Sequence, residues 1–256
     1  MNETEAVKRQ YADDANLALR SRFHKQYSTN KQGLIPWMRE QYRFQTQESV
    51  LELGCGNGAQ WEGVSLPSGC TLVLSDFSPG MLQTAQQRLP EDIAEFRVID
   101  IQNISFTDGA FDAVIANFML YHVPDMDKAL AEVQRVLKPG GRFFAATNGS
   151  GGLHAFIRGA LRHCGMEPAA FAQSHSFRLQ NGGDILCRYF SRVERADYID
   201  SLAVTNTQDL IGWVKSTIPG SGIADWTRLY DHFETIRAAD GVIAIPKECG
   251  MFIAQK

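Results

Sequence analysis

The sequence predicts an α/β protein built on a mainly parallel β-sheet. Apolar runs short enough for strands alternate with helical patterns from Ser49 onward, and a glycine-rich turn follows the first run. Asp76 ends the second run. Strands that alternate with helices usually form parallel sheets, because each helix carries the chain back to the edge at which the next strand begins.

The predicted elements follow one another closely between Ser49 and Asn148. The strand-like runs are VLEL, TLVLSD, FRVID, FDAVIANF and RFFAATN. One helical pattern begins at about Ala59, and two others are SPGMLQTAQQRL and DKALAEVQRVL. The last helix is the clearest, because apolar side chains recur on one of its faces. We expect Asp127 to cap its start and Pro139-Gly140-Gly141 to end it after Leu137.

The flanking regions are expected to build the substrate side of the protein. Residues 3–20 predict an amphipathic helix, and residues 1–48 form an N-terminal helical lid segment before the main domain, residues 49–256. Residues of about 149–190 predict a helical insert that shapes a pocket. The chain then continues with a strand (SRVERADYIDSLAV), a helix (TQDLIGWVKST) and two short strands about a Pro-Lys-Glu turn (GVIAIPKECGMFIAQK).

Composition restricts the classes of partner. The net charge of −4 gives no overall field that attracts nucleic acid or an anionic membrane, so a small-molecule substrate is expected. Five scattered cysteines without a C-x-x-C pair predict free thiols in a reducing compartment. No apolar leader or span is evident, which predicts a cytoplasmic location. The dispersed histidines predict no metal site.

The segment VLELGCGNGAQ carries the chemistry. Glycines at a strand end let the backbone adopt positive φ and let a ligand touch the main chain. Gly54, Gly56 and Ala59 also satisfy the G-x-G-x-x-G/A pattern, and Asp76 follows at the distance expected of a ribose-binding acid. A nucleotide-type pocket is therefore predicted, with a dinucleotide and S-adenosylmethionine both open.

Four ordered pieces resemble the class I S-adenosylmethionine-dependent methyltransferases of the small-molecule type, similar to methyltransferase domain 11. They are VLELGCGNG, LVLSDFSPGML, VIDIQNISFTDGAFDAVIANFMLYHVPD and VLKPGGRFFAATNG, within residues 50–149. The resemblance implies a Rossmann-like, doubly wound sheet of seven strands, mainly parallel with a C-terminal antiparallel strand. It also implies S-adenosyl-L-methionine as cofactor and methyl transfer to an O, N, S or C atom of a small molecule.

The same resemblance assigns roles to residues of this chain. The glycine loop holds the methionine portion, Asp76 binds the ribose hydroxyls, Phe77 and Met81 sandwich the adenine, and Asp100 with Ile101 meets its amino edge. The predicted cofactor-binding residues are Tyr27, Glu52, Gly54, Cys55, Gly56, Gly58, Asp76, Phe77, Ser78, Met81, Asp100, Ile101, Gln102, Asn117, Phe118 and His122.

The catalytic residues and some alternatives stay open. No general base is assigned; the candidates are His24, Tyr27, His122 and His154, and Trp37 and Trp213 are candidate pocket residues. Tyr27 to Lys31 has the Y-x-x-x-K spacing of short-chain dehydrogenases but precedes the glycine loop, which argues against an NAD-dependent oxidoreductase. Methylation of RNA or protein, or cofactor binding without turnover, also stays open.

Overall fold

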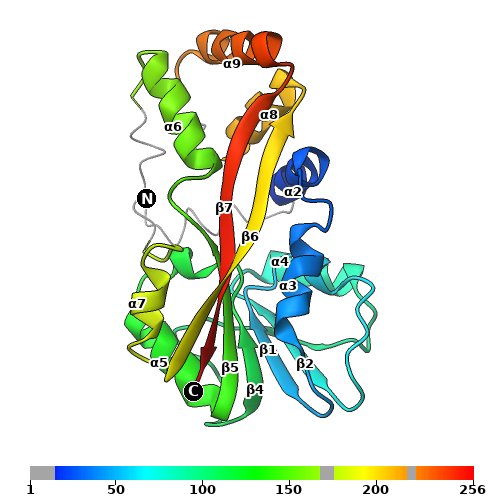
Figure 1. The fold of residues 1–256 in the computed structure, drawn as a ribbon. Helices are drawn as coiled ribbons and strands as arrows, with labels where there is room; N and C mark the ends of the chain where they lie inside the picture. The colour runs from blue at the N-terminus through cyan, green and yellow to red at the C-terminus, as the bar shows by residue number, and fades with distance from the viewer. Residues whose placement is uncertain (1–14, 168–175, 218–222) are drawn as a thin grey trace.

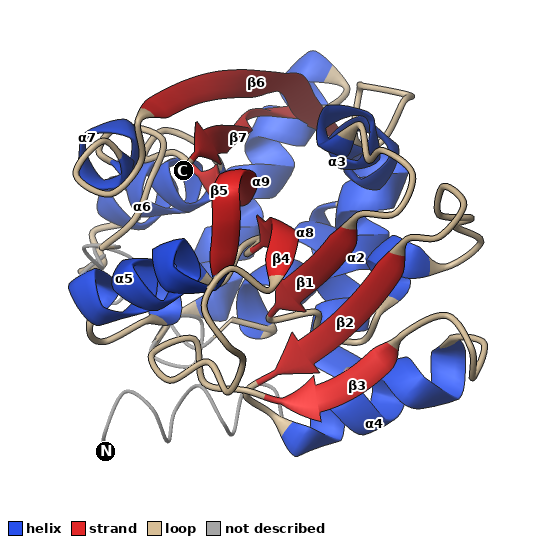
Figure 2. Cartoon of the chain, turned by 90° about the horizontal axis from the view of Figure 1, so that it is seen from below, coloured by secondary structure: helices blue, strands red, loops and turns tan. Residues whose placement is uncertain are grey.

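The structure, a computed structural model, describes residues 15–167, 176–217 and 223–256. Its seven-stranded sheet has the order β3-β2-β1-β4-β5-β7-β6 (Figures 1 and 2). The strands are β1 (Ser49–Leu53), β2 (Thr71–Asp76), β3 (Glu95–Val98), β4 (Phe111–Ile115), β5 (Leu137–Asn148), β6 (Arg192–Val204) and β7 (Ile243–Gln255). The pairs that β7 makes with β5 and β6 are antiparallel and the other four pairs are parallel, which confirms the predicted sheet.

Helices cover both faces of the sheet. The 3₁₀ turn η1 (Ala59–Trp61) and the helices α3 (Leu34–Tyr42) and α4 (Pro79–Arg88) pack on one face; α5 (Met126–Val136) and α7 (Gly182–Leu186) pack on the other. Val50 and Leu51 are both fully buried and belong to different apolar clusters. Successive residues of a strand point to opposite faces, so burial on both faces explains apolar runs without alternation.

Strands β6 and β7 extend beyond the rest of the sheet. Pairing between β5 and β7 ends at Asn148 with Cys249, whereas β6 and β7 stay paired as far as Val204 with Ile243. Four helices surround this two-stranded extension (Figure 1). They are α2 (Ala15–Tyr27), α6 (Leu153–His163), α8 (Thr207–Lys215) and α9 (Trp226–Asp240). We call these helices, with residues 199–204 and 243–248, the cap.

The predicted pair of short C-terminal strands is wrong, because β7 is continuous through the Pro-Lys-Glu segment. Pro246 pairs with Ser201 of β6 at a position beyond the end of β5. At Pro246, β7 has a neighbouring strand on one side only. Proline has no backbone N–H, and on the open side no strand is present that would need one as a hydrogen-bond donor. Helix α9 had no counterpart in the sequence interpretation.

Two helix predictions also need correction. The helix expected from Ala59 is only the 3₁₀ turn η1, because the chain becomes extended at Glu62. Asp125, not Asp127, caps α5, since its side chain accepts a hydrogen bond from the Lys128 N–H at 3.0 Å. The helix predicted for residues 3–20 lies mostly outside the described residues, and its described part belongs to α2. The predicted insert contains α6 and α7, and its residues 168–175 are likewise outside the description.

Candidate active site

The predicted cofactor loops meet at one edge of the sheet. Parallel pairing places the carboxyl ends of β1, β2, β3 and β4 at this edge, which faces the cap. The Cys55 N–H donates to the Ser75 carbonyl at 2.8 Å, and the Ile99 N–H donates to the Asp76 carbonyl at 3.2 Å. These bonds tie neighbouring loops together. Ligands of open α/β sheets bind at such an edge, where the strand order reverses.

Asp76 joins the second strand to the glycine loop. Its Oδ2 accepts from the Gly56 N–H at 2.9 Å, and its Oδ1 accepts from the Ser78 N–H at 2.8 Å. Burial raises the pKa of Asp76, and these backbone donors oppose the rise. Each carboxylate oxygen has a further lone pair. The carboxylate can therefore also accept two vicinal hydroxyl groups, as binding of a ribose requires.

Glu52 lies beneath the glycine loop at the end of β1. Only 2% of the residue is exposed, and the indole N–H of Trp61 donates to its Oε2. Burial raises the pKa of Glu52 to about 7, the Trp61 bond opposes this, and the negative charge of Asp76 adds to it. A cationic ligand group nearby would favour the ionised form. Trp61 was not among the predicted site residues.

Gly54 and Gly58 both have left-handed backbone angles, with φ of 76° and 74°. A Cβ at Gly54 would lie 3.0 Å from Cγ of Met119, and one at Gly58 would lie 2.9 Å from Cδ1 of Leu89. Each position therefore requires glycine for its backbone angle and for close packing. Cys55 between them is buried, and burial raises the pKa of its thiol.

Asn117 connects the fourth strand to the glycine loop. Its Nδ2 donates to the Tyr42 hydroxyl at 2.7 Å and to Gln60 Oε1 at 2.9 Å. Phe118 next to it has a φ of 55°, an unfavourable angle for an aromatic residue that is found mainly at constrained sites. Gln60 and Tyr42 were missed from the sequence. The available signal for Gln60 was its position two residues after the glycine loop; Tyr42 gave no signal.

The predicted adenine-binding residues follow β2 and β3: Phe77 lies in the loop after β2, Met81 in the first turn of α4, and Asp100 and Ile101 after β3. Phe77 is 36% exposed, whereas Met81 and Ile101 are buried. Asp100 accepts from the Gln102 N–H at 2.9 Å, and the Gln102 side chain accepts from the backbone N–H at the start of α5. His122 ends a 3₁₀ turn in the loop after β4, with its ring centre 4.6 Å from that of Tyr121. Their contacts with a cofactor stay predictions.

Tyr27, His24 and His154 lie in the cap and not in the loops at the sheet edge. The Tyr27 hydroxyl donates to Asp209 Oδ2 at 2.5 Å, and its ring packs against Phe23. Burial raises the pKa of Tyr27 to about 12, and Asp209 contributes to the rise. The predicted contact of Tyr27 with the cofactor therefore requires approach from the cap side, and it stays a prediction.

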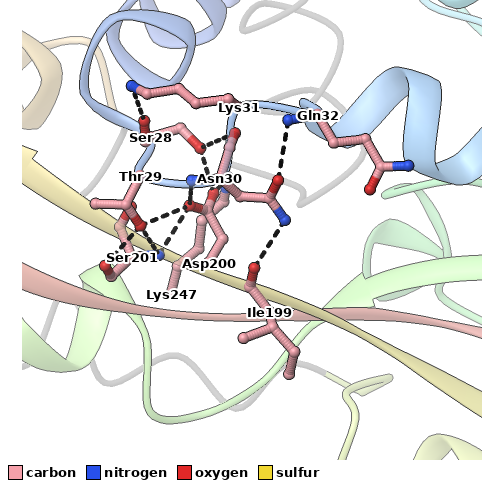
Figure 3. A network of polar contacts seen from close by, with 9 residues as sticks. All are labelled: Ser28, Thr29, Asn30, Lys31, Gln32, Ile199, Asp200, Ser201 and Lys247. Atoms are coloured by element: carbon pink, nitrogen blue, oxygen red, sulfur yellow. Dashed lines mark hydrogen bonds and ion pairs between the residues drawn. The ribbon is translucent and has the colours of Figure 1, made fainter.

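A buried ion pair anchors the segment between α2 and α3 (Figure 3). The Lys247 ammonium lies 2.7 Å from Asp200, whose side chain has no exposed surface. Asp200 also accepts from the Ser28 hydroxyl at 2.6 Å and from the Asn30 N–H at 2.9 Å. This segment belongs to the predicted N-terminal lid, residues 1–48, so any movement of it must either preserve these bonds or break them. Trp37 itself lies in α3, with its ring beside Tyr198.

Comparison with known proteins agrees with this arrangement. Residues 51–145 match the family described as "Methyltransferase domain". Demethylmenaquinone methyltransferase of Clavibacter sepedonicus is 42% identical over 96 residues, which are 37% of this chain and 39% of that protein. The chain thus spans about two fifths of this relative's length. None of the helices within residues 15–167, 176–217 and 223–256 is long and apolar enough to cross a bilayer.

Two solved structures share the fold at low sequence identity. Phosphoethanolamine N-methyltransferase 2 of Haemonchus contortus, in complex with S-adenosyl-L-methionine, superposes with a TM-score of 0.62 and 17% identity, covering 100% of this chain and 60% of that one. The [4+2]-cyclase SpnF superposes with a TM-score of 0.59 and 16% identity, covering 98% of this chain and 94% of that one. These likenesses concern the fold alone.

Proposed function

The chain belongs to the class I S-adenosylmethionine-dependent methyltransferases, and on that premise we propose that it methylates a nucleophilic O, N, S or C atom of a small molecule. The observation that carries the proposal is the Asp76 carboxylate, held by Gly56 and Ser78 beside the glycine loop and facing the cap. A carboxylate in this place accepts from the two hydroxyls of an unphosphorylated ribose.

The residues present fit S-adenosylmethionine. Asp76 retains lone pairs for the ribose, and the glycine turn allows a ligand to approach the main chain. Gln60 Nε2, two residues beyond the loop, is buried without a hydrogen-bond partner among the described residues. A buried donor of this kind is suited to a carboxylate oxygen, such as that of the methionine portion. Glu52 is placed beneath the loop to favour a cationic group.

The cofactor supplies a methyl group activated by its positive sulfonium. With the cofactor held by Asp76, Gln60 and Glu52, a lone pair of the acceptor would displace the methyl group, and the electron pair of the broken carbon–sulfur bond would stay on sulfur. The acceptor's proton passes to solvent or to a base, for which the candidates remain His24, Tyr27, His122 and His154. The protein must align the two reacting atoms at about 3–3.5 Å and exclude water. The cap faces the edge at which this exclusion is needed.

A small-molecule acceptor is supported by the demethylmenaquinone methyltransferase relative and by the net charge of −4. The acidic balance disfavours a nucleic acid, whose phosphates require a basic surface. We also propose that the protein is cytoplasmic and that it binds neither nucleic acids nor membranes. Because a fold and a cofactor site do not by themselves establish turnover, cofactor binding without methyl transfer is the alternative to be tested.

The proposal is tested by calorimetry with S-adenosylhomocysteine and with NAD. We expect the first to bind with a low-micromolar or lower Kd and NAD not to bind. Asp76→Ala should weaken binding by ~1.5–3 kcal/mol, the range for hydrogen bonds to a charged group. Asp92→Ala, at an exposed position after α4, is the matched control and should bind normally. Tighter binding of NAD, or no effect of Asp76→Ala, would contradict the assignment of the site.

Turnover is measured separately, as formation of S-adenosylhomocysteine from S-adenosylmethionine in the presence of quinol, thiol and amine acceptors. Product that depends on both an acceptor and Asp76 supports methyl transfer. Cofactor binding without any product over the whole series would favour the alternative without turnover.

A further inference from the structure

Three polar rings from separate parts of the chain meet inside the cap. His24 comes from α2, His154 from α6 and Trp213 from α8. The ring centre of Trp213 lies 6.1 Å from that of His24, with the planes nearly perpendicular, and 5.6 Å from that of His154. Helix α6 follows the carboxyl end of β5 by a short loop, and His154 is its second residue, so His154 lies at the end of α6 nearer to that edge of the sheet.

Two nitrogens of the cluster are buried without a partner. Trp213 is 4% exposed, and neither its Nε1 nor Nδ1 of His24 has a hydrogen-bond partner among the residues that the structure describes. A buried polar atom without a partner is destabilising, because it has lost its hydrogen bonds to water and gained none in the protein. An indole N–H can only donate, whereas a neutral imidazole nitrogen donates or accepts according to its tautomer. A ligand group placed between the two rings can remove both penalties.

The surrounding charges favour a neutral ligand. Burial, and then the positive charge of Lys247, lowers the pKa of His24 to about 3, so the imidazole is neutral at physiological pH. Lys247 is already paired with Asp200 at 2.7 Å, and Arg20 donates to the Ser216 carbonyl at 2.9 Å. A buried anion requires a cation that pairs with it directly. An uncharged oxygen has no such requirement.

We propose that Trp213 and His24 bind a neutral hydroxyl group of the methyl acceptor and thereby select hydroxyl-bearing compounds such as phenols. A hydroxyl has one donor and two acceptor sites, so it satisfies the indole N–H together with either tautomer of the imidazole. An oxygen about 2.9 Å from each nitrogen can bridge rings at this separation. The inference rests on the proposed function, because it assigns the acceptor side of the same site.

Phenol and toluene are suitable probes because they differ only in a hydroxyl and a methyl group. We would titrate each, by NMR, into the full-length protein saturated with S-adenosylhomocysteine. Phenol should bind about 10-fold more tightly than toluene, the ratio that corresponds to one net hydrogen bond. Trp213→Phe keeps an aromatic ring but removes the donor, and it should abolish this preference. Trp226→Phe, at the start of α9, is the matched control and should retain it.

The outcomes separate the two proposals. Equal binding of phenol and toluene to the wild-type protein, or an unchanged preference in Trp213→Phe, would overturn the hydroxyl site. Benzoate binding more tightly than phenol would overturn its neutral character. If circular dichroism shows that Trp213→Phe is unfolded, His24→Phe provides the same test from the other ring. Failure of the wild-type protein to bind S-adenosylhomocysteine would instead refute the proposed function itself.

Discussion

Replacing Glu52 by glutamine tests whether burial controls the ionisation of this residue. Burial raises its pKa from 4.5 to about 7, so the folded state retains a proton that the unfolded chain releases above pH 4.5. The free energy of unfolding should therefore fall as pH rises through this window. At ~1.4 kcal/mol for each pH unit between the two pKa values, the full loss is about 3 kcal/mol. Glutamine does not titrate and should not show it.

The assay is urea unfolding of wild-type protein and Glu52→Gln between pH 4.5 and 8. The stability of the variant relative to wild type should increase by about 3 kcal/mol across this range. Glu62→Gln changes an exposed residue beside the same loop and should follow wild type at every pH. A pH-independent difference between Glu52→Gln and wild type would refute the reasoning, since it would mean that Glu52 titrates alike in the folded and unfolded states. At pH 8 the variant should also bind S-adenosylhomocysteine about 10-fold less tightly, as expected for a lost hydrogen bond to a charged group.

Two further substitutions test the loop and the anchor. In Gly54→Ala, residue 54 must adopt a φ of 76°, and its Cβ lies 3.0 Å from Met119. We therefore expect thermal unfolding to show a loss of ~1–3 kcal/mol in stability, together with weaker binding of S-adenosylhomocysteine. Normal stability of the variant would show that the loop tolerates a side chain. Asp200→Asn leaves the Lys247 ammonium buried without its counterion. Urea unfolding should show that the variant is ~3–5 kcal/mol less stable than wild type. A loss below ~1 kcal/mol would mean that the pair is solvated. Burial opposes ionisation of Asp200, but Lys247 and Ser28 outweigh it and lower its pKa, so the stabilisation should be present at neutral pH and be lost as pH falls below about 4.

Helix boundaries and turns departed from the sequence expectations where a tertiary contact outweighed a local pattern. The segment after Gly58 carries good helical residues, yet only one 3₁₀ turn forms. In the structure Trp61 of that turn is buried and bonded to Glu52. Pro246 interrupted the pattern of the last strand, although a proline is tolerated where only one neighbouring strand exists. Glu52 is not a sequence neighbour of Trp61, and β6 is not a sequence neighbour of Pro246, so no local signal could reveal these outcomes.

The amino-acid sequence by itself determined the parallel part of the sheet and the edge at which the glycine loop meets Asp76. Strands buried on both faces must be apolar throughout, and a turn at positive φ must contain glycine, so both features are written in short stretches of chain. The loop from Gly54 to Gly58 and the acid Asp76 were recognisable for this reason, and the structure brings them together through the bond from Gly56 to Asp76.

Only the tertiary structure decided how the cap is assembled. Its helices come from three separated parts of the chain, before β1, after β5 and between β6 and β7. They converge because apolar side chains of these four helices pack with those of the two-stranded extension of β6 and β7 in one buried cluster. The meeting of His24 with Trp213, and of Asp200 with Lys247, follows from that packing. Such contacts depend on long-range burial and not on local propensity, which is why the arrangement of the cap could be seen only in three dimensions.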